Sequence, residues 1–296
     1  MTYKLITLFF RFLGLIPKQW GDAIGSWLGR LIYIADAKHR KIAMQNMAYA
    51  FDNHPSQNRE LCLKVFENLG KIIFEMAWSL HLNEKNFFRH FRIEGVSHIR
   101  DAYQKGKGVL ALTAHFGNWE LLRVIAAMIG YPINIIYRPL DFKPLDRFIT
   151  DYRTRFGGKL IPKRKSIRKI LRCLNDGEMA VLLMDQNVSY EEGVFADFFG
   201  HRACTNKGLA LLALKTEAPV IPVFLIREES GFKGLFLPEV PLIRTGDRTK
   251  DIEANTQAYN NVIEAMIRRY PEQWFWVHQR WKTKPYQAWK SETSEK

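Results

Sequence analysis

The chain has 296 residues, of which 47% are hydrophobic and 13% aromatic; this is enough apolar material to bury a large core and excludes a largely disordered chain. The 44 Lys and Arg outnumber the 30 Asp and Glu and give a formal charge of +14. Such a charge favours anionic partners, whether nucleic acid, lipid headgroups, phosphorylated substrates or acidic carrier proteins. Three widely spaced cysteines (Cys62, Cys173 and Cys204) predict neither a disulfide framework nor a metal clamp.

The N-terminal region combines two apolar segments with a basic cluster. Residues 5–16 (LITLFFRFLGLI) form a run of about 12 residues, shorter than the roughly 20 that span a bilayer, and no clear signal-peptide cleavage site follows. A second apolar segment, residues 24–34, carries Trp27, Arg30 and Tyr33, which are typical of the membrane interface. The basic cluster is Lys38, His39, Arg40 and Lys41. We predict that residues 1–36 are membrane-associating helices followed by charges that face anionic lipids; the alternative is a pair of ordinary core helices.

The rest of the chain predicts one α/β domain. Apolar residues at helical spacing fill residues 40–90. Short apolar runs predict strands at 109–113, 133–137, 179–184 and 220–226, and helical patterns at 119–128, 145–156 and 256–269 lie between or after them. This alternation predicts a central mixed β-sheet flanked by helices, within a catalytic domain over residues 37–290 and before a polar tail at 291–296.

A histidine and a glutamate follow the first of these strands, in the segment Thr113-Ala114-His115-Phe116-Gly117-Asn118-Trp119-Glu120. Loops at the carboxyl ends of strands hold ligands in open α/β sheets. Gly117 permits a sharp bend, and a helix that starts after it would return Glu120 towards His115. A neutral imidazole can accept a proton from a substrate hydroxyl, and a carboxylate on its other nitrogen fixes the tautomer. We therefore predict His115 and Glu120 as the catalytic pair; the alternative is a structural histidine beside a helix N-terminal carboxylate.

The segment HFGNWE resembles the H-x4-D/E motif of the glycerolipid and lipid A acyltransferase superfamily, and its Glu form resembles the late acyltransferases of lipid A biosynthesis. Further blocks resemble that family in order along residues 1–290: Tyr137-Arg138-Pro139, Arg153-Thr154-Arg155-Phe156-Gly157, Met184-Asp185-Gln186, Asp197-Phe198-Phe199-Gly200, Pro219-Val220-Ile221-Pro222-Val223 and Pro271-Glu272-Gln273-Trp274. The Arg motif of the glycerol phosphate acyltransferases has only a loose counterpart at Arg202, which argues against glycerol phosphate as the acceptor.

The resemblance implies an O-acyltransferase on the cytoplasmic side of the cell inner membrane. It would transfer a fatty acyl chain from acyl carrier protein to a hydroxyl of the phosphorylated, Kdo-bearing lipid A precursor. The family pattern implies a catalytic role for His115 and Glu120 and places its Asp on Asp185 and its Arg on either Arg153 or Arg155. With Arg138, these residues are the predicted substrate-binding set. No metal or cofactor is implied, and other lipid acceptors (a lysophospholipid, an aminolipid or a glycosylated phosphoinositide) remain an alternative.

Three other features leave alternatives open. In residues 163–172, six of ten residues are Lys or Arg, and Ile167, Ile170, Leu171 and Leu174 predict the apolar face of a helix whose basic face either docks a partner or is simply solvated. The aromatic cluster Trp274, Phe275, Trp276 and Trp281 lines an acyl-chain groove or forms core.

A nucleic-acid-binding protein is disfavoured because no binding signature is present. A hydrolase using His115 on water remains a rival, although the chain lacks the G-x-S-x-G elbow of serine esterases.

Overall fold

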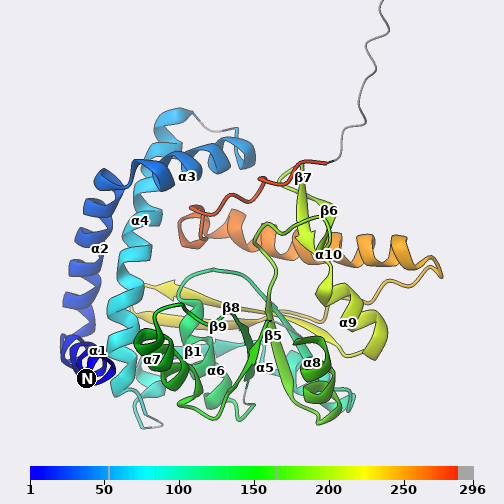
Figure 1. Cartoon of the computed structure of the whole chain (residues 1–296), viewed down its shortest axis with the longest axis horizontal. Helices are drawn as coiled ribbons and strands as arrows, with labels where there is room; N and C mark the ends of the chain where they lie inside the picture. The colour runs from blue at the N-terminus through cyan, green and yellow to red at the C-terminus, as the bar shows by residue number, and fades with distance from the viewer. Residues whose placement is uncertain (53, 84, 132, 164–165, 286–296) are drawn as a thin grey trace, which may run out of the picture.

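A mixed sheet forms the centre of the protein (Figure 1). The computed structural model describes residues 1–52, 54–83, 85–131, 133–163 and 166–285, so the predicted tail at 291–296 lies outside the described residues. Within them, seven strands run in the order β1-β9-β8-β2-β5-β3-β4. Their bounds are β1 Phe91–Glu94, β2 Val109–Thr113, β3 Ile133–Tyr137, β4 Lys159–Pro162, β5 Met179–Leu183, β8 Val220–Glu228 and β9 Gly231–Phe236. Strands β8, β2, β5, β3 and β4 are mutually parallel, and β9 pairs antiparallel with β8.

Helices cover both faces of this sheet, as predicted for an α/β fold with a central mixed sheet. Alternate residues of the fully buried β2 belong to different cores: Leu110 and Leu112 pack in one, Val109 and Ala111 in the other. After β1 begins, the helices are α5 Val96–Gln104, α6 Leu122–Met128, α7 Lys143–Thr154, α8 Ser166–Asn175, α9 Gly208–Thr216 and α10 Arg248–Arg269. The predicted helix at 119–128 begins as a 3-10 turn, η3 (Trp119–Leu121), before α6.

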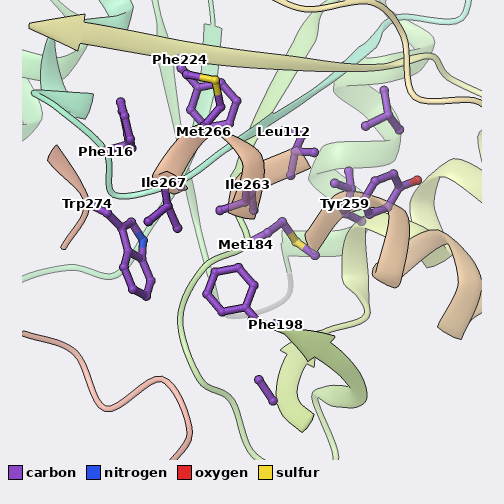
Figure 2. Close-up of a cluster of buried hydrophobic side chains, with 14 of the residues drawn as sticks. Leu112, Phe116, Met184, Phe198, Phe224, Tyr259, Ile263, Met266, Ile267 and Trp274 are labelled. Carbon is purple, nitrogen blue, oxygen red and sulfur yellow. The ribbon is translucent and has the colours of Figure 1, made fainter. Parts of the chain in front are cut away.

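The larger core joins α10 to the sheet and to the C-terminal segment. Ile263, Met266 and Ile267 of α10 lie beside Leu112 and Phe224 of the sheet (Figure 2). Phe198, from the hairpin of β6 (Gly193–Phe198) and β7 (His201–Asn206), closes this cluster beside Trp274, a ring-centroid distance of 5.7 Å away. Trp274, Trp276 and Trp281 are buried, so the predicted aromatic cluster is core at these three positions.

Four helices precede the sheet: α1 Thr2–Leu13, α2 Lys18–Ala35, α3 Ala37–Ala50 and α4 Pro55–Trp78. Helix α2 lies along α4 at one side of the molecule (Figure 1). Their backbones touch, because a Cβ at Gly29 would lie 2.2 Å from the Phe66 carbonyl oxygen and one at Gly25 2.7 Å from the Lys71 Cα. Most large apolar side chains of α2 therefore point away from α4, whereas the Tyr33 ring packs edge-to-face on Phe66 of α4.

As a result, much of the apolar surface of α1 and α2 is exposed. Helix α1 contains no buried residue, and the buried residues of α2 are Gly21, Gly25 and Gly29. The exposed apolar side chains are Leu5, Leu8, Phe9, Phe12, Leu15, Trp20, Ile24, Trp27, Leu31, Ile32 and Ile34. Ordinary core helices would bury such residues. No helix in the described chain combines the length and apolar character needed to cross a membrane.

The basic segment at 163–172 is only partly as predicted. Residues 164 and 165 lie outside the described residues, and α8 begins at Ser166. Ile170 and Leu174 are buried and Leu171 packs against the core, but Ile167, predicted on the same apolar face, is 61% exposed. Ile167 lies in the first turn of α8, where the helix has not yet passed over the sheet core.

Candidate active site

His115 and Asp185 meet at the carboxyl ends of two adjacent parallel strands. In the register of β2 and β5, Thr113 lies opposite Leu183. His115 and Asp185 each come two residues after those strand ends, so the parallel pairing brings them to the same level. The strand order therefore joins residues that are 70 positions apart in the sequence.

Asp185 holds the His115 ring by direct hydrogen bonds. The ring Nδ1 lies 2.9 Å from Asp185 Oδ1, and the His115 backbone amide donates to Asp185 Oδ2 over 3.0 Å. The Trp274 indole donates to the same Oδ2 over 2.9 Å. Because a carboxylate only accepts, the neutral imidazole carries its proton on Nδ1 and keeps Nε2 as an acceptor.

The Asp185 carboxylate is only 2% exposed. Burial would raise its pKa, but the attraction of the His115 ring and the hydrogen bonds from His115 and Trp274 outweigh burial and lower the pKa of Asp185 below its usual value. Asp185 was predicted among the substrate-binding residues. In the structure two of its three hydrogen bonds join it to His115 and the third to Trp274.

The C-terminal segment fixes the loop that follows His115. The Gly117 amide donates to the Gln273 carbonyl over 2.8 Å, and the Phe275 amide donates to the His115 carbonyl over 3.0 Å. Gly117 has φ +56°, and a Cβ there would lie 2.1 Å from the Leu225 carbonyl oxygen, so only glycine fits. The Gly117 amide is therefore already bonded within the protein.

Two aromatic rings flank the His115 side chain. The centroid of Trp119 lies 5.1 Å from the imidazole centroid and that of Phe275 5.9 Å. His115 keeps 22% of its side-chain surface exposed between them. An apolar border with one accessible ring nitrogen suits a reaction in which a fatty acyl group approaches an imidazole.

Glu120 does not bind His115, contrary to the predicted pair. Its carboxylate accepts two hydrogen bonds from Arg153, from Nε over 2.9 Å and from Nη2 over 2.5 Å. The 3-10 turn η3 directs Glu120 towards α7, which carries Arg153, and not back towards the end of β2. The carboxylate five residues after the histidine thus forms a two-point ion pair beside the His115–Asp185 pair.

The contacts of Arg153 and Arg155, the two alternative site arginines, distinguish their roles. Arg153 binds Glu120, whereas the Arg155 guanidinium donates to the carbonyls of Ser79 and Leu82, each over 3.2 Å. Arg155 therefore anchors the 3-10 turn after α4, and Arg153 is the arginine at the site. Arg138, the other predicted substrate-binding arginine, is exposed just after β3 and makes no hydrogen bond or ion pair within the described residues.

A buried ion pair behind the site connects it to α4. Glu75 accepts from Arg227 over 2.5 and 2.8 Å, and the Asn118 side chain donates to Glu75 over 2.8 Å. The side chain of Gln273 bonds the backbone of Arg227 at both its amide and its carbonyl. This network holds Asn118, and with it the loop between His115 and Glu120, against α4. The sequence offered no local signal for it, since its members come from four distant segments.

His278 is the second histidine near the site. The Asn187 amide donates to its Nε2 over 2.8 Å, and burial lowers the pKa of His278 to about 4. The ring is therefore neutral at neutral pH and is occupied by a backbone donor. In the part of the chain that the structure covers, no group of three or more His, Cys, Asp or Glu is placed to hold a metal ion.

Comparison with known proteins decides the family. The family model described as bacterial lipid A biosynthesis acyltransferase matches residues 2–283. The chain belongs to this family. A lipid A biosynthesis acyltransferase of Haemophilus influenzae is 28% identical over 278 residues, covering 93% of this chain and 86% of the relative. The palmitoleoyltransferase and the lauroyltransferase of lipid A biosynthesis in Escherichia coli are 27% and 28% identical, and each alignment covers 88% of this chain and 85% of the relative.

Membership confirms the resemblance inferred from the motifs and makes the chain an acyltransferase of lipid A biosynthesis. Four of the family blocks meet at one site in the structure. His115, Asp185 and Trp274 come from three of them and are joined by hydrogen bonds. Glu120 and Arg153, from the first and third blocks, form the ion pair beside them.

Proposed function

We propose that this protein transfers a fatty acyl chain from acyl carrier protein to a hydroxyl or hydroxyacyl group of the Kdo-bearing lipid A precursor in lipopolysaccharide biosynthesis. Family membership supports acyl transfer, and the +14 charge of the chain suits both an acidic carrier protein and a phosphorylated lipid. We place the reaction at the cytoplasmic side of the inner membrane, where the exposed apolar face of α1 and α2 would enter the lipid.

The hydrogen bond between His115 Nδ1 and the buried Asp185 carboxylate carries this proposal. It leaves Nε2 to take the proton from the acceptor hydroxyl while that oxygen attacks the thioester carbonyl. Asp185 keeps the ring in the required tautomer and stabilises the imidazolium that forms. When the carbon–sulfur bond breaks, His115 returns the proton to the departing thiolate. No covalent acyl-enzyme is needed, because the acceptor hydroxyl is the nucleophile.

In this scheme Glu120 and Arg153 shape the acceptor side of the site. Two nitrogens of Arg153 bind Glu120, and Nη1 makes no hydrogen bond within the described residues. Arg138 is exposed and unpaired there. Guanidinium groups match phosphate geometry. We assign Arg138 and the free edge of Arg153 to a headgroup phosphate of the acceptor.

The test is acyl transfer by the detergent-purified full chain. A mixed pool of acyl carrier protein thioesters and the Kdo-bearing lipid A precursor would be supplied, and products read by mass. The variants are His115→Ala and the matched control His98→Ala, whose half-buried ring on α5 makes no hydrogen bond in the described chain. We expect one added acyl chain with wild type and His98→Ala, and none with His115→Ala.

Three results would contradict the proposal. Release of free fatty acid without acyl-lipid product would favour a thioesterase. Full activity of His115→Ala would remove His115 as the base. If the Kdo-bearing precursor stayed unmodified while another hydroxylated lipid gained the acyl chain, the acceptor assignment would be wrong.

A further inference from the structure

A row of exposed apolar residues on α2 ends at a pocket. Trp20, Ile24, Trp27, Leu31 and Ile34 follow one another at spacings of three and four residues, so they share one face of the helix. Their exposed fractions run from 40% at Ile24 to 70% at Ile34. Ile34, the last of them, also lines a pocket of about 580 Å³ where α2 meets α3. The pocket therefore opens at the end of the apolar face.

This corner pocket combines apolar walls with three cations. Tyr33, Ile34 and Met44 supply the apolar walls, and Arg40, Lys41 and Arg59 supply the charges. Arg59 comes from α4, so the cations converge from two helices. None of the described residues that line the pocket is acidic. A pocket with this lining attracts an anion that also carries an apolar part.

The three cations are not equivalent. Arg40 is fixed, because its Nη1 donates to the carbonyl of Tyr33 and, over 3.0 Å, to that of Ile34, and its guanidinium lies 5.2 Å from the centre of the Tyr33 ring. Lys41 and Arg59 are exposed and have no hydrogen bond or ion pair among the described residues. Arg40 thus closes the end of α2 and builds the pocket, whereas Lys41 and Arg59 are free to bind a ligand.

We propose that this corner pocket binds the phosphate headgroup of an anionic membrane phospholipid. A lipid that lies against the exposed face of α2 would place its acyl chains beside Trp27 and Leu31 and its phosphate beside Lys41 and Arg59. The pocket is lined by α2, α3 and α4 and shares no lining residue with the His115 site. It is therefore a lipid site separate from the one that binds the acyl acceptor. The proposal rests on membrane attachment and not on acyl transfer.

The experiment measures binding of the purified full chain to two kinds of vesicle, phosphatidylcholine alone and phosphatidylcholine with phosphatidylglycerol, by co-sedimentation. The test variant is Lys41→Gln/Arg59→Gln. The matched control, Lys215→Gln/Arg248→Gln, also removes one lysine and one arginine that are exposed and unpaired in the described chain. These lie on α9 and at the start of α10, on the opposite side of the molecule from α2 (Figure 1). Acyl transfer in detergent reports whether each variant is folded.

We expect the test variant to lose about tenfold or more of its affinity for the phosphatidylglycerol vesicles, since each basic residue near an anionic surface contributes about fivefold. Its binding to phosphatidylcholine and its acyl transfer in detergent should match wild type, and the control should change by less than about twofold. Equal losses in the test and control variants would show general charge attraction and overturn the pocket. Unchanged binding of the test variant would overturn it as well. If the wild-type chain bound the vesicles as expected but transferred no acyl group, the result would contradict the proposed function and not this site.

Discussion

The side chains that matter at the site act in two neighbouring pairs with different chemistry. His115 and Asp185 form a hydrogen-bonded pair whose outer ring nitrogen is accessible, while Glu120 and Arg153 form an ion pair with two contacts. Asp185 is buried and has a lowered pKa, so it remains a carboxylate throughout the neutral range. A permanent negative charge behind an imidazole is what a general base requires when it becomes charged.

Replacing Asp185 tests whether its charge supports His115 as the general base. Asp185→Asn keeps the size of the side chain but removes the charge that stabilises the imidazolium, and its amide can hold the wrong tautomer. We expect turnover to fall by roughly 10⁴-fold, the loss known for the equivalent change in a Ser-His-Asp triad. The measurement is kcat at saturating thioester. Asp176→Asn, an exposed residue after α8, is the control and should be unaffected. Retention of more than a tenth of wild-type turnover in Asp185→Asn would show that Asp185 does not act through His115.

At the scale of elements, glycines decide the orientation of α2. The close approach at Gly25 and Gly29 brings the α2 backbone onto α4, and α4 carries Glu75, which binds both Arg227 and Asn118. Helix α4 thus contacts α2 on one side and, through Glu75, the loop between His115 and Glu120 on the other.

The substitution Gly29→Val tests the close packing of α2 against α4. Its side chain would overlap the Phe66 carbonyl, so α2 must move away from α4. Overpacking of this kind costs about 1–3 kcal/mol. We expect a lower midpoint of thermal unfolding in detergent than for Ala23→Val, which adds a branched residue on the exposed face of the same helix. Equal midpoints for the two variants would mean that the contact between α2 and α4 contributes little to stability.

The whole molecule is asymmetric. One side carries the exposed apolar residues of α1 and α2 with the corner pocket, while α9 and the start of α10 lie on the other (Figure 1). An exposed apolar surface of this extent marks an interaction site. We propose that α1 and α2 lie in the plane of a membrane interface with their apolar side chains among the lipids.

The apolar face should bind lipid without regard to charge. We expect Trp27→Gln/Leu31→Gln to reduce affinity for neutral phosphatidylcholine vesicles by about tenfold or more, because each side chain loses apolar burial. Ile167→Gln/Tyr190→Gln, a second exposed pair located outside α1 and α2, is the control. Vesicle co-sedimentation measures both. If the control lost as much affinity as the test pair, the membrane-binding surface would not be α1 and α2.

The sequence alone determined the features that depend on local pattern. The spacing of apolar residues predicted strands and helices of an α/β fold, because burial requires that periodicity. The motif around His115 and the order of the later blocks predicted the family. The N-terminal helices were predicted as well, since their apolar runs are short and continuous.

Only the tertiary structure decided which side chains meet. The spacing of Glu120 from His115 suggested a bond between them, but a 3-10 turn directs Glu120 to Arg153 on α7. Asp185 reaches His115 because β2 and β5 are neighbours in register, a property of the sheet and not of either strand. In the same way Lys41 and Arg59 share a pocket because α3 folds back against α4. Local sequence sets the conformation of each segment, whereas the partners of a side chain depend on packing between segments that are distant in the chain.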